Sequence, residues 1–282
     1  METLSLRSSP SRPCCRPGVV LSIPLMDYDA SRRLQWRLHD ERLADVRPDT
    51  LVLLEHEPVL TLGRTTKDAH WNGLYTEPGN RGLRVIESER GGSVTYHGPG
   101  QVVGYPIVRL RQFCAGPKAY VRMLEEVLIR VLAQWGINGA RANKFPGVWV
   151  NDPADPDGPS AKIAAIGVKI ARGVTLHGFA LNVTVDLEPF AGIVPCGIEG
   201  CRVTSMAEVL RREVELHEVR HRIAQCFGEV FGLEWQDSPL ARISHQAPSR
   251  RPQQKAGEKS GLQPPPAADV NIRARHVPGL VG

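Results

Sequence analysis

The fold of this chain is decided by the stretch AKIAAIGVKIARGVTLHGFALNVTVDLEPFAGIVPC, residues 161–196. It contains two β-like runs that meet at Arg172-Gly173, where the sequence predicts a turn. A turn there folds the second run back along the first, so Lys162 near the start and Cys196 at the end can approach each other. A thiol beside an ammonium group is a nucleophile. We therefore predict that this pair carries the chemistry of the protein.

Outside this stretch, helix and strand patterns follow one another irregularly. The clearest helix is Lys118–Trp135, in which apolar residues recur with a period of about 3.6 residues. Further strands are expected at Val19–Ile23, Thr50–Glu55, Val59–Leu62, Leu83–Ile86, Val102–Val108 and Phe145–Val150. Further helices are expected from Asp27 or Asp29 to Val46, at Val203–Arg212 and at Glu215–Phe231. Long loops are expected at Gly63–Gly82 and Asp152–Ser160. Because a regular βαβ alternation is missing, we predict an α+β fold with a mixed or antiparallel sheet and flanking helices.

Charge and proline content divide the chain into three parts. Residues 238–282 hold seven Lys/Arg, two Asp/Glu and seven of the 23 prolines, and residues 1–17 hold three Arg and one Glu. We expect a disordered leader at 1–17 and a disordered, basic, proline-rich tail at 238–282. The folded domain expected at 18–237 carries 25 basic and 27 acidic residues. The net charge of +5 therefore comes from the two ends of the chain.

Composition and motifs disfavour several classes of protein. Nucleic-acid binding is disfavoured because the folded part is slightly acidic and has no stripe of basic and aromatic residues. No apolar run approaches the ~18 residues that span a bilayer, and the N-terminus lacks the apolar core of a secretory signal, so we expect a cytoplasmic protein without membrane contact. The six cysteines lack the spacing of zinc ligands and are expected to be reduced. His217 and His221 match the H-E-x-x-H zinc pattern without a clear third ligand, so we predict a solvated helix edge and no metal.

Both members of the expected catalytic pair have a purely structural interpretation as well. Cys196 lies between Pro195 and Gly197, which favours a constrained and exposed turn, yet most intracellular cysteines are small buried residues. Lysines at the start of a strand usually extend to solvent, as we expect for Lys169. The residues alone leave these alternatives open for Cys196 and Lys162.

A glycine-rich strip, Arg90–Gln101, lies between two expected strands and contains His97. Its glycines allow the backbone to approach a ligand and to present N–H groups. The alternative is a hairpin rich in tight turns, with His97 as a hydrogen-bonded turn residue. The glycines from Gly98 to Gly104 only weakly resemble a dinucleotide-binding loop, because a strand and not a helix follows them. The chain has no GxxxxGK[ST] motif, so a phosphate loop for nucleoside triphosphates is unsupported.

Three motifs taken in order carry a family resemblance. They are RGGSVTYHGPGQVVGYPI from residue 90, KIAAIGVKIARGVTLHGFALNV from residue 162, and GIVPCGI from residue 192 followed by VTSM. Together they resemble the lipoyl(octanoyl) transferase family, over about Val19–Trp235. The resemblance implies a fold similar to the catalytic domains of biotin and lipoate protein ligases. It also implies transfer of an octanoyl group from acyl carrier protein to a lysine of a lipoyl domain, as the first step of lipoate biosynthesis.

The resemblance assigns roles to single residues of this sequence. The family's acyl-thioester cysteine falls on Cys196, and the lysine that activates it falls on Lys162. The substrate-contacting segments fall on Arg90, Gly91, Gly92, Ser93, Val94, Thr95, Tyr96 and His97, on Ala165, Ile166 and Gly167, and on Gly178, Phe179 and Ala180. Of these, Val94, Ile166 and Phe179 are candidates to line an apolar slot for the octanoyl chain. The chain departs from the family pattern at both tails, in the Asp152–Ser160 loop, at Ser93, where many members carry Gln, and at Cys201. Cys201 follows Cys196 closely enough in sequence to raise the hypothesis of a disulfide between them under oxidation, which would inactivate the enzyme.

The resemblance also implies the partners and the alternatives. A thioester is already activated, so neither a cofactor nor ATP is expected. The expected donor is octanoyl-acyl carrier protein, the expected acceptors are lipoyl domains of 2-oxoacid dehydrogenases and the glycine cleavage H protein, and a monomer is expected. One alternative is an ATP-dependent lipoate-protein ligase on the same fold, and another is a non-catalytic paralogue that binds acyl carriers.

Overall fold

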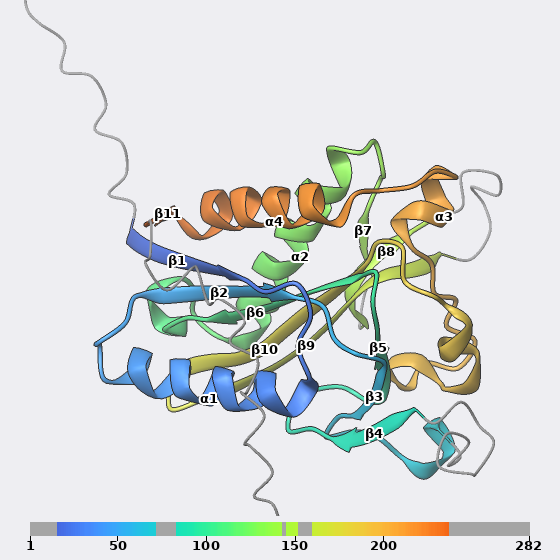
Figure 1. Cartoon of the computed structure of the whole chain (residues 1–282), viewed down its shortest axis with the longest axis horizontal. Helices are drawn as coiled ribbons and strands as arrows, with labels where there is room; N and C mark the ends of the chain where they lie inside the picture. Colours follow the sequence, from blue (N-terminus) through green and yellow to red (C-terminus); the bar gives the residue numbers. More distant parts are fainter. Residues whose placement is uncertain (1–15, 72–82, 143–144, 152–159, 237–282) are drawn as a thin grey trace, which may run out of the picture. The chain divides into compact units, whose positions relative to one another are not determined.

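A computed structural model of the chain describes residues 16–71, 83–142, 145–151 and 160–236 (Figure 1). The expected tail and nearly all of the expected leader lie outside these residues, as do parts of the two expected long loops. The strands are β1 (Arg16–Ser22), β2 (Asp49–Leu54), β3 (Val59–Leu62), β4 (Arg84–Glu87), β5 (Thr95–His97), β6 (Gln101–Ile107), β7 (Ala140–Ala142), β8 (Phe145–Val150), β9 (Ala161–Ala171), β10 (Val174–Asn182) and β11 (Leu233–Trp235). The α-helices are α1 (Tyr28–Leu43), α2 (Pro117–Ala133), α3 (Met206–Leu210) and α4 (Leu216–Phe231), and short 3₁₀ turns lie at Asp68–His70, Leu110–Gln112, Glu188–Gly192 and Pro195–Gly197.

The two runs of the stretch 161–196 form the antiparallel pair β9 and β10. Their register runs from Ala171 opposite Val174 to Ala164 opposite Leu181. Arg172 and Gly173 have φ angles of 49° and 83°, the left-handed conformation that a tight two-residue hairpin turn requires. The predicted turn is therefore confirmed.

The large sheet has eight strands in the order β11-β1-β2-β6-β10-β9-β8-β7. In it, β1 pairs in parallel with β2 and with β11, and the other pairs are antiparallel. A second sheet has the order β4-β3-β5. This mixed arrangement confirms the predicted α+β class, in which helices cover a sheet without βαβ repeats.

Helices cover both faces of the large sheet (Figure 1). On one face, α2 and α4 pack against each other and the sheet, with Leu124, Leu128 and Phe227 completely buried. On the other face, α1 places Leu34 and Leu38 against β6 and β10. The apolar stripe of each helix faces the sheet because its buried residues recur every three to four positions. The core therefore lies in two layers, one on each side of the central strands.

Several boundaries differ from those expected. The helix expected at Val203–Arg212 is the five-residue α3, because Val203 bridges to Lys162 and Ser205 caps the helix by accepting a hydrogen bond from the Glu208 N–H. The first helix ends at Leu43 rather than near residue 46. β1 begins at Arg16, inside the range expected for the leader, where it pairs with β11.

Three-residue strands were the elements missed by the sequence analysis. β5, β7 and β11 are too short to show alternation, and pairing with a neighbouring strand is what defines them. Among the described residues, no helix is both long and apolar enough to cross a membrane.

Because α2 packs against the sheet, shortening one of its buried side chains should leave a cavity and destabilise the folded protein. We expect Leu128→Ala to lower the free energy of unfolding by about 2–5 kcal/mol, because Leu128 is completely buried and alanine suits a helix. Leu25→Ala, at a side chain that is 44% exposed, is the matched control and should change it by less than about 0.5 kcal/mol. Urea unfolding followed by circular dichroism measures both, and equal effects would contradict the layer assignment.

Candidate active site

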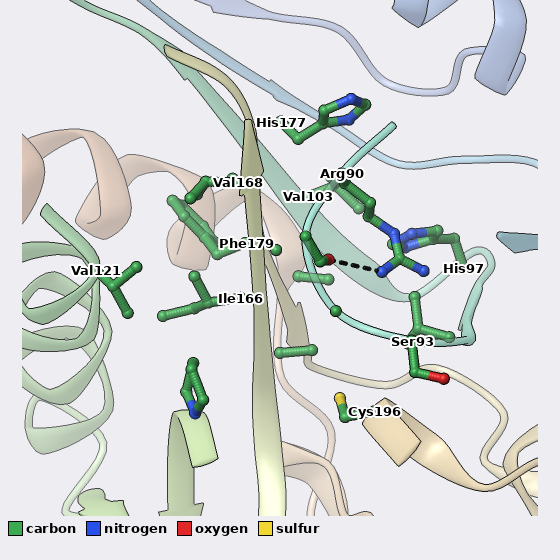
Figure 2. A pocket seen from close by; sticks show the side chains of 18 of the residues that line it. Arg90, Ser93, His97, Val103, Val121, Ile166, Val168, His177, Phe179 and Cys196 are labelled. Atoms are coloured by element: carbon green, nitrogen blue, oxygen red, sulfur yellow. Dashed lines mark hydrogen bonds between the residues drawn. The ribbon is translucent and has the colours of Figure 1, made fainter. Parts of the chain in front are cut away.

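A cavity of about 320 Å³ opens between β9, β10, the glycine-rich strip and the loop that carries Cys196. Fourteen of the sixteen predicted site residues line it: Arg90, Gly91, Gly92, Ser93, Thr95, His97, Lys162, Ala165, Ile166, Gly167, Gly178, Phe179, Ala180 and Cys196. Figure 2 shows Ile166 and Phe179 on one side of the cavity, Arg90 and Ser93 on the other, and Cys196 at one end. Segments far apart in the sequence therefore meet at one site.

Val94 and Tyr96 correct the expectation that the whole strip contacts substrate. Both are buried in a separate apolar cluster with Leu60 and Phe190, and neither lines the cavity. Successive side chains of an extended strip point to opposite faces. From Ser93 to His97, alternate residues of the strip therefore face the cavity, and Val94 lies on the opposite face without lining it.

The glycine-rich strip lies directly against β9. The Gly91 N–H donates to Val168 O at 3.0 Å, and a Cβ added at Gly167 would lie 2.7 Å from Gly91 O. Real Cβ atoms do not tolerate such a contact, so glycine is required at position 167. This approach brings Arg90 into the wall of the cavity.

Arg90 is a buried cation whose acceptors are all uncharged. Its guanidinium donates to Thr61 O at 2.6 Å and to Thr61 Oγ1 at 2.8 Å. It also donates to Gly91 O at 3.1 Å, the bond drawn as a dashed line in Figure 2. Within the described parts of the chain, no carboxylate forms a salt bridge with it. Burial lowers the pKa of Arg90, and negative charge on Tyr28 or Cys196 raises it. Arg90 therefore gives this wall a positive potential that an anion in the cavity would experience.

Cys196 lies in a strained turn. Its φ is 58°, a left-handed conformation that side chains other than Asn and Asp rarely adopt. The turn is held because the Cys196 N–H donates to Val94 O at 3.1 Å and the Val194 N–H donates to His70 O at 2.7 Å. A Cβ at Gly197 would lie 3.0 Å from the His70 ring. The thiol is thus fixed by the residues around it and remains half-buried at the cavity wall.

Lys162 lies in the same cavity but is held by other groups. Its side chain is only 3% exposed, and Nζ donates to Pro146 O at 3.3 Å and lies 4.7 Å from the centre of the Trp149 ring. Among the described residues, no hydrogen bond joins Lys162 Nζ to Cys196 Sγ. Of the two alternatives left open for Lys162, the side chain that extends to solvent is therefore the wrong one. The role of the pair stays a prediction, now with both groups on one cavity.

His97 belongs to a buried polar cluster behind the strip. Its Nδ1 is 2.7 Å from Gln101 Oε1, and its ring contacts those of His56 and Tyr28. Burial lowers the pKa of His56 to about 4 and lowers that of His97 well below its ordinary value. These imidazoles are neutral at pH 7, so His97 can act as a hydrogen-bonding group and not as a cation.

Four polar residues at the site were missed by the sequence analysis. Tyr28, Tyr105 and His177 line the cavity, and His70 lies within 2.6 Å of Ser93 Oγ through its Nδ1. A signal existed only for His177, which interrupts the apolar run of β10. The two tyrosines gave no signal, because aromatic residues are common in buried strands and helices.

The other motifs stay outside this site. His217 and His221 are exposed on α4, and the described residues contain no group of three or more His, Cys, Asp or Glu placed to hold a metal ion. Cys196 and Cys201 are free thiols, both half-buried.

Comparisons with known proteins agree on the family. Residues 27–228 match the family described as the lipoyl protein ligase A/B catalytic domain. The octanoyltransferase of Koribacter versatilis (strain Ellin345) is 46% identical over 243 residues, which cover 83% of this chain and 94% of that protein. The octanoyltransferase of Mycobacterium leprae (strain Br4923) is 42% identical over 80% of this chain and 94% of its own.

Solved structures share the fold at low identity. A bipartite archaeal lipoate protein ligase from Thermoplasma acidophilum has a TM-score of 0.58 and 15% identity, covering 79% of this chain and 87% of that one. Lipoate-protein ligase A bound with ATP has a TM-score of 0.55 and 17% identity, over 79% and 88% of the two chains. The predicted likeness to lipoate protein ligases is confirmed at the level of the fold.

The buried imidazoles predict acid lability. The pKa of His56 is about 4 in the folded state against about 6.5 when exposed, so the unfolded state binds the proton first and stability falls as pH drops from about 6.5 to 4. His56 alone should remove on the order of 3 kcal/mol of unfolding free energy. His56→Gln should flatten this dependence and His217→Gln, at a 78% exposed side chain, should not. Urea titrations at several pH values measure the free energy of unfolding. If its dependence on pH is unchanged in His56→Gln, His56 is not the source of the acid lability.

Proposed function

We propose that this chain, which belongs to the lipoyl protein ligase A/B catalytic domain family, transfers an octanoyl group from acyl carrier protein to a lysine of a lipoyl domain through a thioester at Cys196. Its curated relatives are octanoyltransferases, so it is an acyltransferase. The observation that supports the mechanism most directly is that Cys196 and Lys162 line one cavity whose other walls are largely apolar.

The proposed reaction has two steps at the same sulfur. In the first, the Cys196 thiolate forms a bond to the octanoyl carbonyl carbon, and the bond from that carbon to the carrier sulfur breaks. The carrier thiolate leaves and takes a proton from the Lys162 ammonium, which becomes neutral. In the second, the neutral amine of the acceptor lysine attacks the acyl-enzyme, and Cys196 leaves as the thiolate. The amine loses one proton as the amide forms, so a base must accept it.

Two cations support the charges of this reaction. The Lys162 ammonium favours the Cys196 thiolate, and in its neutral form accepts the proton of the acceptor amine. Arg90 stays charged and adds a fixed positive potential. Since its acceptors are neutral, this potential is uncompensated and favours anionic oxygen or sulfur in the cavity. His97 is neutral and orients the substrate through hydrogen bonds.

The cavity suits a medium-length acyl chain. Ile166, Val168, Phe179 and Val103 form apolar walls between Cys196 and the far end (Figure 2). Burying seven carbons beyond the carbonyl contributes at most about 5 kcal/mol, at ~0.8 kcal/mol each. The proposed acceptors are the lipoyl domains of 2-oxoacid dehydrogenases and the glycine cleavage H protein.

An ATP-dependent lipoate ligase is the second candidate, because a solved ligase bound with ATP has a similar fold. The 46% identity to an octanoyltransferase favours transfer over ligation. The two functions differ in the need for the cysteine, since a ligase that activates its substrate with ATP needs no thiol.

Octanoyl transfer predicts a covalent adduct on one residue. After mixing with octanoyl-acyl carrier protein, intact mass spectrometry should show one octanoyl group on the protein and peptide mapping should place it on Cys196. Cys196→Ser should lower transfer to a lipoyl domain by roughly 10³-fold or more, because a hydroxyl is a far weaker nucleophile at neutral pH. Cys201→Ser is the matched control and should keep the adduct. Transfer that survives in Cys196→Ser and depends on ATP would establish the ligase instead.

The role of Lys162 predicts the reactivity of the thiol. Lys162→Met, of similar length and without charge, should slow alkylation of Cys196 by iodoacetamide at pH 7 by roughly tenfold, since about 1.4 kcal/mol of thiolate stabilisation is lost. Lys169→Met is the control on the same strand, where Nζ lies over the Trp36 ring. Equal alkylation rates in the wild type and both variants would exclude electrostatic activation by Lys162.

A further inference from the structure

Helix α2 carries a carboxylate in the face that packs against the sheet. Glu125 is 5% exposed, and its neighbours Leu124 and Leu128 on the same face are completely buried. Removing a carboxylate from water costs free energy unless other groups of the protein pair with it. The proposed reaction gives Glu125 no role. Its partners therefore indicate why a charge is kept at this position.

Glu125 has one partner on β8 and another on β7. Its Oε1 accepts a hydrogen bond from the Gly147 N–H at 3.2 Å, and its Oε2 lies 3.3 Å from Arg141 Nε. The Arg141 side chain is 40% exposed and also pairs with Glu126, so solvent weakens its attraction to Glu125. The bond from Gly147 is buried, and it distinguishes Glu125 from Glu126.

The Gly147 N–H belongs to the same peptide group as the Pro146 carbonyl. A peptide group is planar and trans, so its N–H and its C=O point in opposite directions. The N–H points to Glu125, and the carbonyl oxygen accepts a hydrogen bond from Lys162 Nζ at 3.3 Å. One peptide plane therefore connects the carboxylate on α2 with the lysine of the cavity.

This peptide needs an anchor because a glycine follows it. Gly147 has a φ of 128°, and a Cβ at this position would lie 2.5 Å from Ala164 O. Glycine is required for this close approach of β8 to β9, but its backbone also rotates more freely than that of other residues. A rotated peptide would turn its N–H toward the Lys162 ammonium, and two donors repel each other. The bond to Glu125 opposes this rotation.

The other contact of the Lys162 ammonium does not direct its hydrogens. Nζ lies 4.7 Å from the centre of the Trp149 ring, and the face of an aromatic ring attracts a cation from a broad range of directions. In the described part of the chain, the hydrogen bond of Nζ is the one to Pro146 O. The place of the ammonium in the cavity therefore depends on the Pro146 carbonyl.

We propose that Glu125 is a positioning residue for Lys162. Its carboxylate fixes the plane of the Pro146–Gly147 peptide, and the carbonyl of that peptide holds the ammonium at the cavity that Lys162 shares with Cys196. Glu125 is not among the residues that line the cavity, so it acts through Lys162 and does not touch the substrate. The inference rests on the proposed function for the effect of Lys162 on the thiol.

The reactivity of Cys196 tests this inference with and without substrate. Glu125→Leu removes the acceptor, so alkylation of Cys196 by iodoacetamide at pH 7 should slow by roughly threefold to tenfold, approaching the effect of Lys162→Met. With octanoyl-acyl carrier protein as donor, kcat should fall at least about fivefold, whereas KM should stay within about twofold, because no contact with the carrier is lost. Glu126→Leu is the matched control, since Glu126 also pairs with Arg141 and should leave both rates unchanged.

A neutral acceptor should rescue the variant. An amide has one acceptor oxygen, and in Glu125→Gln this oxygen is drawn to Arg141. Combining Glu125→Gln with Arg141→Met frees the oxygen for the Gly147 N–H, so this double variant should recover the alkylation rate of the wild type to within about threefold. Arg141→Met alone keeps the carboxylate and should react as the wild type does. Loss of stability alone would not produce this pattern in folded protein.

Two results would overturn the inference. One is a folded Glu125→Leu protein with unchanged alkylation and unchanged kcat, and the other is an Arg141→Met protein as impaired as Glu125→Leu, because the ion pair and not the peptide would then matter. If Glu125→Leu does not fold, the double variant decides, and slow alkylation in it counts against the inference. A wild type that transfers no octanoyl group, but whose thiol slows in Glu125→Leu, would lose the proposed function and keep this inference.

Discussion

The site depends on a close main-chain contact between the glycine-rich strip and β9. The Gly91 N–H donates to Val168 O at 3.0 Å, and Gly167 has no space for a Cβ because Gly91 O would lie 2.7 Å from it. With the strip held there, Arg90 to Ser93 line the cavity, and so do Thr95 and His97. The position of Cys196 depends on the same contact, because the Cys196 N–H donates to Val94 O in the strip. One backbone approach therefore places both the wall of the cavity and the nucleophile.

Much of the fold could be predicted because the strongest patterns are local. The turn at Arg172-Gly173 and the helix α2 follow from residues that neighbour each other in sequence, and both form as expected. The boundaries of α3 could not be predicted, because Val203 is held by a bridge to Lys162, about forty positions earlier in the chain. The three-residue strands were missed for the same reason: pairing with distant residues, and not their own pattern, defines them.

The members of the site were more predictable than their geometry. The motifs indicated Cys196 and Lys162, yet sequence could not show that the ammonium donates to the carbonyl of Pro146. Which face of the strip meets the cavity also required the structure, because alternation gives two faces without saying which is inside, and Val94 was assigned to the wrong one. His177 was visible in the sequence as a polar residue in an apolar strand, but only the structure shows that it lines the cavity.

The main chain of Lys162 has a further consequence. Its N–H donates to Arg202 O at 2.8 Å, and its carbonyl accepts from the Thr204 N–H at 3.0 Å, so the segment that follows Cys196 is fastened to the lysine's own backbone. The span from Cys196 to Arg202 is therefore held at both ends, by the glycine-rich strip at Cys196 and by β9 at Arg202. Adding or removing one residue in this span would displace either the sulfur or the strand beside it. The length of the loop is therefore as constrained as the identity of the two residues, and an evolving chain can retain the pair only by retaining that spacing.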